Sequence, residues 1–113
     1  MIITTTDLVH GKKVERFLGI VAGEAVIGSN VIADLFRGLR GVVSSTSSEY
    51  RKHLIAARTL ALKDMENNAI ELGANAVIGV DLDYEVLDRG EVVLMVVANG
   101  TAIVLADEMR EAK

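Results

Sequence analysis

The chain contains no cysteine among its 113 residues. Disulfides, a thiolate nucleophile and thiolate metal ligands are therefore excluded, and thiol usage gives no indication of the cellular compartment. Soft metal ions lose their best protein ligand, and only His10 and His53 remain as imidazole ligands.

Basic charge is also scarce, because 12 Lys and Arg residues are outnumbered by 16 Asp and Glu residues, which gives a net charge of −4. Affinity for nucleic acids depends largely on clustered Lys and Arg that neutralise phosphates. We therefore expect no nucleic-acid partner.

Long apolar runs are missing as well. A membrane helix needs roughly 18 or more uninterrupted apolar residues, whereas the run 92–98 ends at Asn99 and the run around Ile20 contains Glu24. The amino-terminal stretch MIITTTDLVHGKK has neither the basic start nor the long apolar centre of a secretory signal. These absences predict a soluble, cytoplasmic protein without a membrane partner.

Apolar residues, by contrast, make up 50% of the chain, and the mean hydropathy is +0.35. This value is high for a small monomer, whose surface is large relative to its volume. Residues 1–113 fit one domain of ordinary size. Part of the apolar surface is expected to lie between subunits.

The first part of the chain predicts strands. Residues 2–5 are typical of a short strand and residues 14–28 of a long one, with a turn around Gly11. Because glycine lacks a Cβ, three positions in the long strand suit bends or bulges that let it curl: Gly19, Gly23 and Gly28.

Two helices are predicted next. The segment SNVIADLFRGLRG, residues 29–41, has the apolar spacing of a short helix. A hydroxyl-rich loop over 42–48 contains the start of a capping box, Thr46 to Glu49, and leads to a long helix that Gly73 closes. The apolar stripe of this helix comprises Tyr50, Leu54, Ala57, Ala61, Met65 and Leu72.

Two strands complete the chain. Along residues 76–86 the even positions face one way, and three acids face the other: Asp81, Asp83 and Glu85. The run from Val92 is apolar on both faces, which is typical of a central strand. Asn99-Gly100 fits either a type I′ hairpin turn or a bulge in one strand through Leu105. The bulge is favoured, because a hairpin would leave two very short strands.

These elements predict an α+β fold of β-α-β-β order, with one long helix packed on a small mixed sheet and a short helix beside it. Two strands joined through helices are expected to run parallel. The last strand then lies between them, antiparallel to both, which gives three strands. So small a sheet leaves exposed edges and an uncovered face, and self-association would remove both.

The segments GEAVIGSN, GLRGVVS, LGANAVIGVDLDYEVL and VVANGTAIVL resemble, in order and spacing, the YbjQ-like family of heavy-metal-binding domains. The resemblance spans nearly the whole chain. It implies a subunit similar to that of dodecin, assembled as a ring-like homopentamer, in a family without an established reaction. This chain departs from the family pattern at Ser44 and Ser45, where glycines are usual.

The three strand acids are the candidate metal ligands. Successive residues on one strand face are about 6.7 Å apart, too far for Asp81, Asp83 and Glu85 to enclose one cation alone. The simpler interpretation is a solvated strand face. In a symmetric ring, however, Asp81 or Asp83 from each copy would meet near the axis, and carboxylates favour a hard divalent cation such as Ca²⁺ or Mg²⁺ as cofactor.

Two arginines form the second candidate site. Arg51 and Arg58 lie seven residues apart near the edge of the apolar stripe, beside the sheet or a neighbouring subunit. A partly buried arginine requires an acidic partner, and Glu24 or the strand acids could form an ion pair with it across an interface. The alternative is that both side chains lie along the surface with their charged ends in water.

A third candidate site combines cations and hydroxyl groups before the long helix. Backbone N–H groups at a helix amino terminus favour anions. The residues concerned are Arg37, Arg40, Ser44, Ser45, Thr46 and Ser47. The two arginines are also explained as cations at a helix carboxyl end. The pattern of a nucleotide-binding loop is missing, so we do not propose ATP.

No residue is assigned a catalytic role, because no nucleophile elbow is present and the strand acids lie far along the chain from the serine-rich loop. The sequence predicts a small homo-oligomer, a pentamer by the resemblance, that binds a small ligand or cation at subunit interfaces or on the axis. The alternative is a hydrolase-type enzyme that uses interfacial carboxylates and the serine-rich loop.

Overall fold

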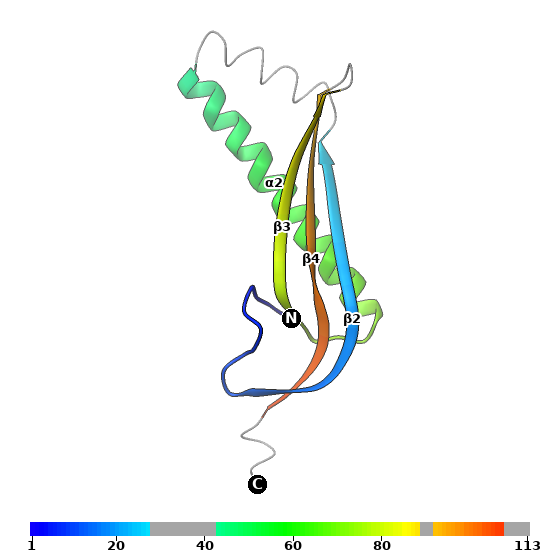
Figure 1. The fold of residues 1–113 in the computed structure, drawn as a ribbon. Helices are drawn as coiled ribbons and strands as arrows, with labels where there is room; N and C mark the ends of the chain where they lie inside the picture. Colours follow the sequence, from blue (N-terminus) through cyan, green and yellow to red (C-terminus); the bar gives the residue numbers. More distant parts are fainter. Residues whose placement is uncertain (28–42, 89–91, 108–113) are drawn as a thin grey trace.

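The computed structural model describes residues 1–27, 43–88 and 92–107 (Figure 1). The short helix expected over 29–41 lies outside these residues. Within them, the elements are β1 (Ile2–Ile3), β2 (Lys12–Ile27), α2 (Val43–Glu71), β3 (Ala76–Asp88) and β4 (Val92–Asp107). The expected α+β class is confirmed.

The strands form one sheet in the order β1-β3-β4-β2. β4 pairs antiparallel with both β2 and β3, so the central place predicted for the strand that is apolar on both faces is confirmed. β1 pairs parallel with β3 through Ile2 and Ile3. The sheet therefore has four strands rather than the expected three.

The Asn99-Gly100 stretch lies inside the continuous strand β4, which confirms the single strand and excludes the hairpin. The bulge lies in the partner strand instead. Between Ile78 and Asp81, β3 has two residues opposite the single residue Gly100 of β4. Gly79 has a φ of 61° there, the left-handed conformation of a glycine bulge.

This bulge corrects the predicted strand faces. Ala76 and Ile78 pack on the sheet face away from α2, whereas Val80 packs with Val77 on the α2 side. The even positions before and after the bulge therefore face opposite ways, because one inserted residue shifts the two-residue alternation of a strand.

The N–H groups that leave the β3–β4 ladder at the bulge find partners in the amino-terminal segment. The N–H of Gly79 donates to the carbonyl of Thr6 (2.9 Å), and the N–H of Val80 donates to the carbonyl of Thr4 (3.1 Å). The bulge is thus held by residues far away in the sequence.

β2 curls along its length. Its register with β4 shifts between Val14 and Arg16 and again between Phe17 and Gly19. Gly19 has a φ of 121°, so the bulge predicted at this glycine is confirmed, while Gly28 lies outside the described residues. The curl allows Val14 to pack against the buried apolar cluster on the face away from α2.

α2 packs across the other face of the sheet, and Gly23 allows the two backbones to touch. A Cβ at Gly23 would meet backbone atoms of Ala61 and Met65, including the Met65 Cα at 2.8 Å. Gly23 therefore serves helix contact rather than the predicted bend. Over residues 51–71 of α2, the buried residues are Ala57, Ala61, Met65 and Ala69. Leu72, placed in the stripe from the sequence, is 48% exposed because it follows the last helical residue.

The carboxyl end of α2 has the predicted glycine closure. Gly73 has a φ of 90°, and its N–H donates to the carbonyl of Ile70 (2.9 Å). The N–H of Ala74 donates to the carbonyl of Ala69 (3.0 Å). This pair of bonds is the Schellman pattern of a helix end.

The amino end of α2 differs from the prediction. The helix begins at Val43, so the loop expected over 42–48 and the capping box expected at Thr46 are wrong. Serine and threonine are favoured near a helix start because their side chains bond to local backbone groups. The run of serine and threonine therefore indicates where the helix starts to within a few residues, but it does not identify the first helical residue.

We expect Gly23→Ala to lower the free energy of unfolding by about 1–3 kcal/mol, the usual cost of overpacking, because the new methyl group meets helix backbone. Urea unfolding at fixed protein concentration measures this loss. Gly100→Ala is the matched control. Its three nearest contacts would all lie in β3, with the Val77 and Val80 side chains and the Ile78 carbonyl oxygen. It therefore crowds the sheet without meeting the helix backbone, and its loss should be smaller. An equal loss in both variants would contradict the role of the helix contact.

Candidate functional site

α2 crosses the sheet obliquely, and its amino-terminal half diverges from β3 and β4 (Figure 1). The divergence leaves a cleft of about 400 Å³ between helix and sheet. The cleft is lined by Arg51, Leu54, Ile55, Arg58, Tyr84, Val86 and Leu94. Its volume is within the range of small-molecule binding sites.

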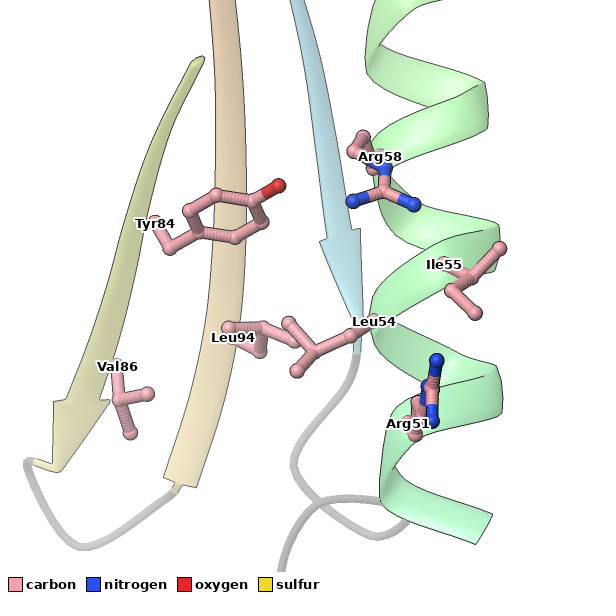
Figure 2. Close-up of a pocket in the computed structure, with 7 residues that line it drawn as sticks. All are labelled: Arg51, Leu54, Ile55, Arg58, Tyr84, Val86 and Leu94. Atoms are coloured by element: carbon pink, nitrogen blue, oxygen red, sulfur yellow. The ribbon is translucent and has the colours of Figure 1, made fainter. Parts of the chain in front are cut away.

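The cleft has an apolar floor and a polar rim (Figure 2). Leu54 of α2 and Leu94 of β4 extend toward one another across the floor. Tyr84 of β3 directs its hydroxyl toward the side of α2 on which Arg58 lies. Arg51 lies two helical turns before Arg58, at the other end of the rim.

Both arginines carry charge that no carboxylate neutralises within the described side chains. The one salt bridge found in that part of the chain joins Lys63 and Glu66 on α2, at 3.8 Å. Arg51 and Arg58 are both exposed. The rim of the cleft is therefore cationic and accessible.

Helix periodicity explains why the arginines are at the sheet. Arg51, Leu54 and Arg58 follow the spacing that puts them on the same side of α2 as the buried Ala61. Their position beside the sheet agrees with the sequence prediction. Tyr84 was given no role by the sequence, although an aromatic ring with a polar tip near the end of an apolar strand face is a usable signal.

The face of the sheet opposite α2, termed the outer face, carries the three strand acids. Asp81 pairs with Asn99 and Asp83 with Val97 in the β3–β4 ladder, and Glu85 follows on the same side. All three acids are exposed. Coulombic repulsion from Asp81 raises the pKa of Asp83, with further contributions from desolvation and a side-chain hydrogen bond with Asp81.

The described residues of one copy do not complete a metal site. Within residues 1–27, 43–88 and 92–107, no group of three or more His, Asp or Glu side chains is arranged to hold a metal ion. His10 lies in the turn before β2, and His53 lies on α2. Asp81, Asp83 and Glu85 would therefore need further donors to bind a cation.

The predicted ion pair does not form within one chain. Glu24 lies on the outer face of β2, opposite Val97, whereas Arg51 and Arg58 line the cleft on the α2 side. The ion pair across an interface stays a prediction that needs a second copy.

The anion site before the long helix is only partly covered by the described residues. The structure places Ser44, Ser45, Thr46 and Ser47 within the first five residues of α2, not in a loop. Their side chains, with all of Arg37 and Arg40, lie outside what the structure describes. This site also stays a prediction.

Apolar side chains of β2 extend the outer face beyond the acids. Phe17, Ile20 and Val26 are 70%, 84% and 60% exposed, and Met95 and Val97 of β4 lie half-buried beside them. Several large apolar side chains exposed on one sheet face are typical of an interaction site.

A family model with the description "Putative heavy-metal-binding" matches residues 1–106. The chain belongs to this family, the YbjQ family. The YbjQ-family chain is similar in fold to a crystal structure from Pediococcus pentosaceus ATCC 25745, of a protein of unknown function in the DUF74 family. The TM-score is 0.64 and the sequence identity 18%, and the match covers 94% of this chain and 98% of that chain. In the described parts of the YbjQ-family chain, no helix has the length and apolar character to cross a membrane.

We expect Asp81→Asn to lower the pKa of Asp83 toward the ordinary value of 3.8, because it removes the main repulsion. A raised pKa means that the folded chain binds the proton more tightly than the unfolded chain. The resulting stabilisation is present below the ordinary pKa and is lost as the pH rises through the raised value. As the pH rises from below 3.8 through the raised pKa of Asp83, the free energy of unfolding should therefore fall less in Asp81→Asn than in the wild type.

Titration of the Asp83 carboxyl carbon by NMR measures the pKa directly. Glu85→Gln is the control, because Glu85 is not among the causes of the shift. An Asp83 pKa that stays raised in Asp81→Asn would refute the assignment.

Proposed function

We propose that the chain is the subunit of a small homo-oligomeric binding protein that holds a small ligand in the cleft between α2 and the sheet. The observation that supports this proposal is the composition of the cleft. It combines an apolar floor with Arg51 and Arg58 on the α2 side and the Tyr84 hydroxyl on the β3 side. Small-molecule sites typically have this composition, an apolar lining with a few placed polar groups.

Self-association is supported by the shape of the chain. The radius of gyration is 18.1 Å, whereas a compact chain of this length has about 13 Å. The sheet is covered by α2 on one face, and Phe17, Ile20 and Val26 are exposed on the other. The family resemblance implies five copies in a ring, and a closed ring would cover apolar surface of every copy in the same way.

A divalent cation is a second candidate ligand, and the description of the family names heavy metals. The observation that favours a cation is the repulsion between Asp81 and Asp83, which raises the pKa of Asp83 and which a bound cation would relieve. Without cysteine, the available acidic donors favour hard cations such as Ca²⁺ or Mg²⁺ over soft heavy metals. Such a site would combine carboxylates from several copies.

The hydrolase alternative stays a prediction, because the side chains of the serine-rich segment lie outside the described residues. The geometry supports binding more directly, since the cleft residues are themselves described.

Native mass spectrometry of the protein purified without chelator tests the proposal, because it reads subunit number and retained mass together. We expect a multimer of five copies. Ile20→Glu should lower the subunit number, because it places a charge on the most exposed apolar residue of the outer face.

Asn67→Glu is the matched control, since it adds the same charge at an exposed position of α2 and should leave the multimer intact. Light scattering at micromolar concentration provides an independent mass. A monomer under these conditions would overturn the assembly.

A further inference from the structure

We propose that the ligand of the cleft is an amphipathic anion, a molecule with an apolar body and one carboxylate or comparable acidic head group. This inference rests on the proposed function and adds the chemical class of the ligand. The head group binds to the guanidinium of Arg58 and the hydroxyl of Tyr84, and the apolar body packs between α2 and the sheet.

The charge of the rim selects an anion. Among the described residues that line the cleft, Arg51 and Arg58 carry the charge and none is an acid. Neither arginine has a salt-bridge partner among the described side chains, as the sole pair there is Lys63 with Glu66. The strand acids cannot neutralise them within the chain, because Asp81 and its neighbours lie on the outer face.

Tyr84 locates the head group at one end of the cleft. Its hydroxyl points toward the side of Arg58 (Figure 2), so a carboxylate between the two accepts hydrogen bonds from both. Arg51 lies about 10 Å away along the helix axis, given 1.5 Å per residue. It adds positive potential along the rim.

The apolar floor selects an extended apolar body. Leu54, Val86 and Leu94 line the cleft from three different elements, and Val86 is 45% exposed. Leu94 is buried at the base of the cleft and Leu54 is half-buried, so Val86 offers the most exposed apolar surface of the three. Each methylene group buried there improves affinity about fourfold.

The probe for the test is decanoate, with three comparison molecules: decanol, decylamine and butyrate. Isothermal titration calorimetry on the assembled protein measures each affinity, and native mass spectrometry of the same sample gives the subunit number. We expect decanoate to bind at least tenfold more tightly than decanol and than butyrate, and decylamine to bind most weakly of the ten-carbon probes.

Three variants locate the site. Arg58→Met keeps the aliphatic stem and removes the charge, so it should weaken decanoate binding about tenfold or more while leaving decanol nearly unchanged. Tyr84→Phe should weaken decanoate binding about threefold. Lys63→Met is the matched control, because it removes one positive charge from the opposite side of the same helix and should change the dissociation constant less than twofold.

Several outcomes would overturn the inference: decanol binding as tightly as decanoate, an affinity unaffected by Arg58→Met, or no decanoate binding up to millimolar concentration. A change of subunit number in Arg58→Met without any decanoate binding would show that a second copy fills the cleft, which also overturns it. If the wild-type chain is a monomer that still binds decanoate with the expected charge preference, the assembly proposal fails while the ligand class is supported.

Discussion

The structure depends on one close contact, between the backbone of β2 at Gly23 and the backbone of α2 at Ala61 and Met65. Only a residue without a Cβ allows an approach this close, and alanines at neighbouring helix positions extend it. Because α2 is one continuous helix, fixing its carboxyl half against β2 also fixes the direction of its amino half. The cleft exists because that direction leads away from β3 and β4 (Figure 1).

The same helix protects the edge of the sheet. β2 is an edge strand, and its outward backbone groups would otherwise be open to pairing with another chain. The N–H of Glu24 donates to a carboxylate oxygen of Asp64 (3.0 Å), and the side-chain amide of Asn68 donates to the carbonyl of Ala22 (2.8 Å). At this part of β2 the outer face is therefore a better surface for association than the strand edge.

The sequence predicts those parts of the molecule that depend on local pattern. The central place of β4 follows from its two apolar faces, and the end of α2 follows from Gly73. The side of the sheet on which Ala76 and Ile78 lie could not be predicted, because the bulge at Gly79 is held by Thr4 and Thr6, which are close only in the folded chain. Arg51 and Arg58 were singled out by helix spacing. Tyr84 had a signal in the sequence, an aromatic ring with a polar tip, but the direction of its hydroxyl depends on the bulge and on the path of α2.

The bulge in β3 also sets the chemical identity of the two sheet faces. Over residues 80–86, the odd positions carry carboxylates and the even positions carry apolar or aromatic side chains. A strand of the same residues without the extra position would exchange the two sets, so that Asp81 and Asp83 would face the helix and Tyr84 would face away from it. Inserting or deleting one residue at this point therefore moves every side chain of β3 after Gly79 to the other face of the sheet. Changes of chain length should be tolerated less at this bulge than in a surface turn.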